Sequence, residues 1–180
     1  SSQSHVLMGA PGVRRGDPDY FALYVGNHVL GGSGLVSRIS QEIRDKRGLS
    51  YSAYSYFVPM KELGPYTLGF QTRNTQRDEA LKVLRDTLQD FIDKGPTAKE
   101  LKASKSNITG GFPLRVASNS KIIEYLAVIG FYDLPLDYLS TFNANIEAVT
   151  VEQIRDAYKR RVKVDDMITI TVGGAAKPAS

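Results

Sequence analysis

The sequence predicts an α+β fold in which a mixed, largely antiparallel sheet packs against several helices. Short apolar segments suited to strands are separated by long amphipathic segments suited to helices. Two strand-like segments, 50–58 and 66–72, are joined by a short turn and predict one antiparallel hairpin. The 180 residues are enough for a sizeable core, so we expect a single domain covering 1–180.

The N-terminal elements begin with a strand at 6–10, which Pro11 and Gly12 end. A helix is predicted over 17–30 because Asp17 is a capping residue and Pro18 suits the first helical position. We expect Gly31 and Gly32 to end this helix, and the glycines of the loop 31–34 to form a helix-to-helix turn that needs positive φ.

A second helix is predicted over 35–46. Its apolar side chains Leu35, Ile39 and Ile43 recur every four residues and therefore share one face. Gly48 is well placed as the glycine that follows the end of this helix.

The rest of the chain contains the hairpin and five helical stretches. Segment 50–58 (SYSAYSYFV) alternates small and aromatic residues with the two-residue period of a strand. Thr97 with Glu100, and Thr150 with Gln153, form capping boxes that mark two helix starts. The remaining predictions are helices at 75–94, 118–131 and 136–147, a buried final strand at 167–172 (MITITV) and a tail at 173–180.

Composition is typical of a soluble globular chain, with 42% hydrophobic and 23% charged residues. The absence of cysteine excludes disulfides, thiolate metal sites and a cysteine nucleophile. No apolar run is long enough for a membrane span. The net charge of +4 is mild and scattered, which does not favour nucleic-acid binding. Because Ser1 stands where an initiating methionine would, we expect a processed or excised chain.

Catalytic motifs are missing. The only histidines, His5 and His28, belong to neither His-x-x-Glu-His nor His-Glu-x-x-His, so we expect no metal site in this chain. His28 lies in a helix rich in apolar residues and is expected to be structural. No Gly-x-Ser-x-Gly motif is present. The pairs Asp17/Asp19 and Asp165/Asp166 are expected to be solvated.

The segment 44–51 (RDKRGLSY) is the strongest functional signal. It places Arg44 near a helix end and Tyr51 seven residues later, at the start of a strand. Two hydrogen-bond donors could then converge on a carbonyl oxygen that gains negative charge. No residue pattern supplies a group to attack that carbonyl, so a helper domain of an enzyme is indicated. The alternatives are that Arg44 offsets the helix dipole, as Lys46 and Arg47 would, and that Tyr51 only packs.

An RNA-binding α+β module is a second hypothesis. Segment 23–27 (LYVGN) is similar to the shorter motif of RNA-recognition domains, and Arg47, Gly48, Tyr51 and Tyr54 partly match the longer one. However, Leu23 and Arg47 are too close for the βαβ unit of roughly 30 residues that would separate these motifs. Helix signals also place Tyr24 on a helix.

The run 20–57, with its Leu-Gly-Gly, its Ser-Arg and an arginine seven residues before a tyrosine, resembles the C-terminal-half domain of the pitrilysin/insulinase family of zinc peptidases. These inverzincins carry a His-x-x-Glu-His motif. The resemblance implies the α+β fold of processing-peptidase-like domains. It also implies that Arg44 and Tyr51 orient a peptide and stabilise the oxyanion opposite a zinc held elsewhere.

The missing zinc motif implies that zinc lies on a partner domain of the same chain or on a second subunit in a heterodimer. Ser52 and Tyr54 are expected to line the substrate cleft, and the exposed edge of strand 50–58 could pair with an extended peptide. Within the family, the alternative is a structural core subunit without activity. A bacterial periplasmic location is an analogy only, and the lack of cysteine neither supports nor excludes it.

Overall fold

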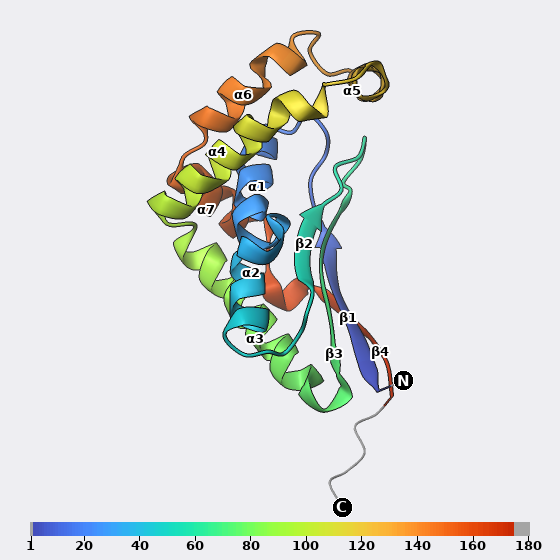
Figure 1. The fold of residues 1–180 in the computed structure, drawn as a ribbon, viewed down its shortest axis with the longest axis vertical. Helices are drawn as coiled ribbons and strands as arrows, with labels where there is room; N and C mark the ends of the chain where they lie inside the picture. The colour runs from blue at the N-terminus through green and yellow to red at the C-terminus, as the bar shows by residue number, and fades with distance from the viewer. Residues whose placement is uncertain (1, 175–180) are drawn as a thin grey trace, which may run out of the picture.

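The computed structural model describes residues 2–174 and consists of one sheet with a layer of helices on one of its faces (Figure 1). The sheet has the strand order β2-β3-β1-β4, and each neighbouring pair is antiparallel. An isolated parallel bridge joins Arg14 to Met60. The strands are β1 (Gln3–Pro11), β2 (Ala53–Phe57), β3 (Pro65–Arg73) and β4 (Ile168–Val172).

The helical layer confirms the predicted α+β class. Two π-helical turns, His28–Gly32 and Gln41–Asp45, directly extend the first two α-helices. The α-helices are α1 (Tyr20–Asn27), α2 (Arg38–Ser40), α3 (Arg77–Lys94), α4 (Ala98–Arg115), α5 (Asn119–Phe131), α6 (Tyr138–Ala148) and α7 (Val151–Arg161). None of the helices in residues 2–174 has the length and apolarity needed to cross a membrane.

The core lies between the helices and one face of the sheet. Val6 and Met8 of β1 and Leu68 of β3 are buried against the helices, whereas Leu7, between the first two, is 42% exposed on the opposite face. This alternation follows from the two-residue period of a strand. Tyr158 of α7 is fully buried and contacts the ring of Phe91 of α3 edge-on, with centroids 4.9 Å apart.

The final strand forms where predicted, but the prediction that it is buried is wrong. β4 lies at the sheet edge and is exposed along its whole length. Ile170 pairs with Leu7 and therefore shares the face of the sheet that turns away from the helices. Ile168 and Val172 lie on the same open face. An apolar segment is buried only if another layer covers its face, which the sequence does not reveal. Of the predicted tail, residues 175–180 lie outside the described residues.

The first predicted helix differs at both ends. α1 begins at Tyr20, after a turn in which Asp17 accepts a hydrogen bond from the Asp19 backbone N–H at 2.9 Å. The helix does not end at Gly31 but continues to Gly32 as a π-helical turn. Gly31 and Gly32 do not have positive φ, whereas Gly34 does, at 66°.

Gly31 is required for a different reason than the predicted one. A Cβ atom at this position would lie 2.3 Å from the Ser55 Oγ and 2.5 Å from the Ser55 backbone nitrogen. Only glycine therefore allows the helical layer to approach the edge strand β2 this closely.

The second predicted helix is broken into a 3-10 turn at Gly34–Val36, then α2, then the π-helical turn Gln41–Asp45. Gly48 follows this segment with φ of 60°, which confirms its predicted role. Both predicted capping boxes, at Thr97 and Thr150, are also present.

The expectation that Asp17 and Asp19 are solvated is wrong. Asp17 is 9% exposed and pairs with Arg161 at 2.7 Å. Asp19 pairs with both Arg160 and Arg161, at 2.9 and 2.6 Å. The hydrogen bond from Arg160 contributes most to lowering the pKa of Asp19. Because these arginines come from α7, far along the chain, only the tertiary structure brings the charges together. Asp165, by contrast, is 98% exposed although it pairs with Arg85.

We expect Gly31→Ala to destabilise the fold by about 1–3 kcal/mol, the usual cost of forcing extra atoms into a packed site. The measurement is the free energy of unfolding in urea. Gly110→Ala is the matched control, because a Cβ there meets nothing within 4 Å in the middle of α4. Alanine should stabilise that helix by roughly 0.5–1 kcal/mol. Equal effects of the two substitutions would contradict the close-approach explanation.

Candidate functional site

Arg44 and Tyr51 lie next to each other, as the sequence predicts. The guanidinium carbon of Arg44 lies 5.2 Å from the centroid of the Tyr51 ring. The turn at Gly48 reverses the chain between them, and the Gly48 N–H donates to the Arg44 carbonyl at 2.9 Å. Tyr51 precedes β2 rather than belonging to it, so its direction is not set by the alternation along the strand.

Both side chains are available to a partner. Tyr51 is 80% exposed, and the Arg44 side chain is 32% exposed. The nearest carboxylate to Arg44 is that of Asp45, with Nη1 and Oδ1 3.6 Å apart. The guanidinium therefore keeps donors free while it stacks on the phenol ring.

The neighbouring basic residues are held elsewhere. Arg47 donates to the carboxylate of Glu42 at 2.6 Å and to its backbone carbonyl at 2.8 Å. Lys46 also pairs with Glu42, at 2.5 Å. Burial raises the pKa of Glu42, but the hydrogen bonds from Lys46 and Arg47 outweigh this effect and lower it. Of these three cations, Arg44 is the one stacked on Tyr51.

Arg38 fixes the segment that carries Arg44. Its Nε and Nη2 donate to the two carboxylate oxygens of Glu100 at 2.9 and 2.7 Å, a bidentate pair. Nη2 also donates to the Gly95 carbonyl at 3.1 Å, and the guanidinium lies over the Phe91 ring. Burial raises the pKa of Glu100, but the hydrogen bonds from Arg38 and Thr97 lower it to about 2.

The segment that carries Tyr51 is fixed to β3. The Ser50 hydroxyl lies within 2.6 Å of the Gln71 carbonyl and 2.8 Å of the Ser52 carbonyl. The Thr72 hydroxyl donates to the Leu49 carbonyl. Leu49 and Ser50 are buried, so the exposed Tyr51 is held by neighbours that cannot move freely.

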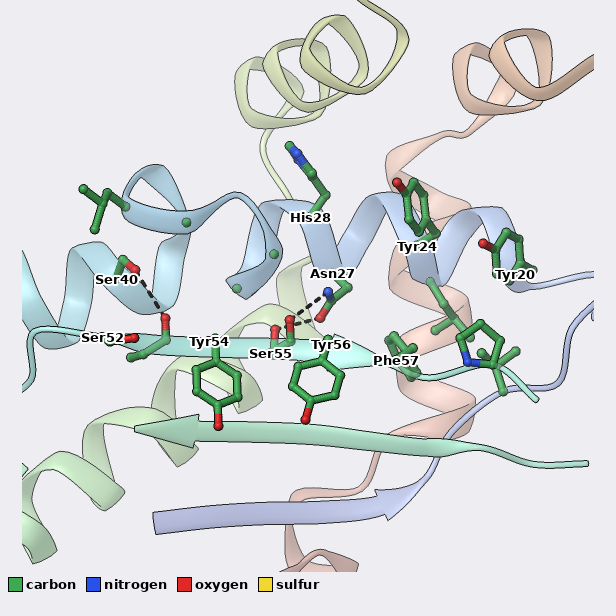
Figure 2. A pocket seen from close by; sticks show the side chains of 18 of the residues that line it. Tyr20, Tyr24, Asn27, His28, Ser40, Ser52, Tyr54, Ser55, Tyr56 and Phe57 are labelled. Carbon is green, nitrogen blue, oxygen red and sulfur yellow. Dashed lines mark hydrogen bonds between the residues drawn. The ribbon is translucent and has the colours of Figure 1, made fainter. Parts of the chain in front are cut away.

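A groove of about 790 Å³ begins at Tyr51 and follows β2 beneath α1 (Figure 2). Asn27 of α1 is joined to Ser55 of β2 by two hydrogen bonds: its amide donates to the Ser55 carbonyl at 3.0 Å, and its Oδ1 accepts from the Ser55 hydroxyl at 2.7 Å. The Ser40 hydroxyl donates to the Ala53 carbonyl at 3.4 Å. These side chains occupy two carbonyls at the edge of β2 that an added peptide strand would otherwise use.

Ser52 and Tyr54 both line the groove, as expected for the predicted substrate-binding residues, but they do not join Arg44. Tyr54 points away from α1 across β3, and its ring stacks on that of Tyr56 with centroids 5.7 Å apart (Figure 2). A role for either residue in binding stays a prediction.

Sequence reasoning missed the other end of the groove, where Arg15, Tyr20, Tyr24 and Arg115 contribute to the lining. Tyr20 and Tyr24 are four residues apart and share one face of α1, a signal that the sequence did contain. No local pattern connects Arg115, at the end of α4, with α1.

His28 lies between two helices, which agrees with the structural role expected for it, and it also lines the groove. Its ring nitrogens contact the Ser104 hydroxyl at 2.7 Å and the Asn107 amide oxygen at 3.2 Å, which ties α1 to α4. Ser104 is 5% exposed, so a substrate does not reach it. Burial lowers the pKa of His28. Within residues 2–174, no three His, Asp or Glu side chains form a group that could hold a metal ion.

The family model described as "Peptidase M16 inactive domain" matches residues 1–108. The chain belongs to the M16 peptidase family. This confirms the predicted resemblance to the zinc-free domain of zinc peptidases. Segment 23–27, on which the RNA-binding hypothesis depended, lies in helix α1 rather than in a strand, and that hypothesis is not favoured.

Several bacterial proteins are similar to this M16 inactive domain. The uncharacterized zinc protease YmxG of Bacillus subtilis is 35% identical over 123 residues, covering 68% of this chain and 30% of the relative. The non-peptidase homolog YmxG of Helicobacter pylori is 28% identical over 181 residues, covering 98% and 41%. The crystal structure of a peptidase M16 inactive domain from Pseudomonas fluorescens has a TM-score of 0.91 at 39% identity, covering 99% and 43%. The present chain spans less than half the length of each.

We expect Glu100→Gln to destabilise the M16 inactive domain by on the order of 1 kcal/mol at pH 7, because it removes the charge that pairs with Arg38. Glutamine keeps the capping box, so the change reports on the ion pair. The folded-state pKa of Glu100, about 2, lies below its ordinary 4.5. The ionised carboxylate therefore stabilises the fold above pH 4.5, and this contribution is lost as the pH falls toward 2.

The measurement is the free energy of unfolding of both proteins from pH 7 to pH 2, where the difference between them should shrink below pH 4.5. Glu152→Gln, in the exposed first turn of α7, is the control and should show little difference. A difference between wild type and Glu100→Gln that stays constant across this range would contradict the assignment.

Proposed function

We propose that this M16 inactive domain contributes Arg44 and Tyr51 to peptide-bond hydrolysis by a zinc peptidase whose zinc is held by another domain or subunit. The observation that carries the proposal is the pair itself. The half-buried Arg44 and the exposed Tyr51 stack on each other at one end of the groove, and the described residues contain no group of three His, Asp or Glu that could hold a metal ion.

The chemistry suits a carbonyl that becomes an oxyanion. Arginine stays charged at neutral pH and presents several N–H donors in a fixed plane. The phenol of Tyr51 adds one O–H donor. Donors that are already oriented stabilise negative charge as it develops, without reorganisation during the reaction. The anchors of the two segments, Arg38 with Glu100 and Ser50 with Gln71, supply this orientation.

The residues of this chain do not fit a zinc site. His28 is already engaged by Ser104 and Asn107, and the other histidine, His5, lies on the sheet, on β1. We therefore propose that a domain or subunit with the His-x-x-Glu-His motif supplies zinc. Both arrangements, a second domain on the same polypeptide and a heterodimer, agree with relatives more than twice the length of this chain.

The lining of the groove suits a peptide substrate. Its walls combine aromatic rings with a few polar groups, which is typical of sites that bind organic ligands. Ser52 would contact the peptide beside the reacting carbonyl, and Tyr54, whose ring points across β3, would contact it through its backbone. A peptide would lie along the groove without completing the ladder of β2, because Asn27 and Ser40 already occupy edge carbonyls.

A purely structural subunit is the second candidate. The observation that favours it is the Helicobacter pylori relative, which is called a non-peptidase homolog. In that case the pair would only stabilise the fold or an interface.

We expect Arg44→Ala and Tyr51→Phe each to lower kcat of the assembled peptidase about 10²–10³-fold, with a smaller change in KM. The reason is that each removes a donor that is used mainly in the transition state. The measurement is steady-state cleavage of a fluorogenic peptide, with assembly checked by gel filtration.

Arg47→Ala is the matched control. It removes an arginine from the same helix end that is paired with Glu42, and it should leave turnover unchanged. If Arg44→Ala and Tyr51→Phe both cleave at the wild-type rate, the oxyanion role is wrong and the structural candidate is favoured.

A further inference from the structure

The far end of the groove is basic. Arg15 and Arg115 both line it, together with Tyr20 and Tyr24. Arg15 donates to the Tyr20 hydroxyl at 3.0 Å, and Arg115 donates to the Tyr24 hydroxyl at 2.9 Å. The two tyrosine rings stack with centroids 5.9 Å apart, so the guanidiniums are attached to neighbouring rings on one face of α1. Figure 2 shows both tyrosines on α1, beyond the end of β2.

These two arginines are not neutralised. The lining of the groove contains no aspartate or glutamate. Among the ion pairs within residues 2–174, none involves Arg15 or Arg115. Glu124 and Lys121 of α5 line a shallower hollow on another side of Arg115, where Glu124 makes no ion pair with it. The groove thus carries two positive charges without a carboxylate partner.

Arg15 is also incompletely satisfied. Its guanidinium is packed between the rings of Tyr20 and Tyr132, 5.5 and 5.4 Å from their centroids. Its Nε is buried and has no hydrogen-bond partner. An unsatisfied buried donor makes this charged group costly to bury, and a carboxylate beside the rest of the guanidinium would offset part of that cost.

We propose that the Arg15/Arg115 end of the groove binds a carboxylate of the peptide. The chemistry is shared by an internal acidic side chain and by a free C-terminal carboxylate. The inference rests on the proposed function, because it concerns the same groove. It names the substrate class as peptides with a negative charge at a defined distance from the reacting bond.

The distance follows from the strand beside the groove. Arg15 is held at the far end of β2, where its N–H donates to the Met60 carbonyl at 2.8 Å. Tyr51 stands at the other end, just before Ala53 begins the strand. A peptide that follows β2 must pass along its five residues, Ala53–Phe57, to go from Tyr51 to Arg15. The carboxylate would therefore lie at least five residues from the bond that is cleaved.

The test uses fluorescein-labelled, C-terminally amidated peptides of twelve residues or so, each with glutamate or glutamine at a single position. Their dissociation constants for the purified 180-residue chain are measured by fluorescence anisotropy. A second pair of peptides has no internal acidic residue and differs only in whether the C-terminus is free or amidated. This pair separates binding of a C-terminal carboxylate from binding of an acidic side chain. We expect the charged member of a pair to bind about tenfold more tightly, the effect of one charge-assisted hydrogen bond.

The preference is the ratio of the dissociation constants of the glutamine and glutamate peptides. Arg115→Gln and Arg15→Gln should each reduce this ratio toward one. Arg115 is exposed, so its substitution leaves the fold intact; Arg15→Lys covers the case in which Arg15→Gln does not fold, because it keeps the charge but loses the planar donors. Arg77→Gln is the control, a half-buried arginine that pairs with its neighbour Asp78 on α3 and lies outside the groove, and it should keep the full preference.

Equal affinities for glutamate and glutamine peptides, a free C-terminus that gives no advantage, or a preference that survives in both groove variants would overturn the inference. Its failure is separable from that of the proposed function. Arg44→Ala and Tyr51→Phe act on turnover at the opposite end of the groove, and they should leave the preference for charge in binding unchanged.

Discussion

The close approach of Gly31 to Ser55 is the constraint on which the candidate site depends. A side chain at residue 31 would overlap both the hydroxyl and the backbone nitrogen of Ser55. Because there is none, α1 and its π-helical extension lie directly over β2, where Asn27 can exchange two hydrogen bonds with Ser55. The groove is the space left beside this contact, so its walls are as rigid as the contact itself.

Two further anchors convert this packing into an oriented pair of donors. Arg38 locks the helical segment of Arg44 to the start of α4 through a bidentate pair with Glu100. Ser50 locks the segment of Tyr51 to β3. The anchoring groups thus supply the rigidity, while Arg44 and Tyr51 remain free to bind. Preorganisation of this kind is what electrostatic stabilisation of a transition state requires.

The distribution of charge separates structural arginines from those available to ligands. Arg160 and Arg161 are paired with Asp17 and Asp19 and hold α7 against the start of α1. Arg15 and Arg115, by contrast, donate to tyrosine hydroxyls rather than to carboxylates. The net charge of +4 does not reveal this difference, because it sums all charges without regard to which cations are paired with a carboxylate.

The sequence alone determined the fold class, the hairpin, the capping boxes and the pairing of Arg44 with Tyr51, because each depends on patterns within a few turns or strand residues. The tertiary structure alone decided the rest. The exposure of β4 depends on which face another layer covers, and the role of Gly31 depends on a strand more than twenty residues away. The basic end of the groove joins Arg15 and Arg115, which are 100 positions apart in the chain. Local propensity carries no information about such distant contacts, since they are set by how the layers pack.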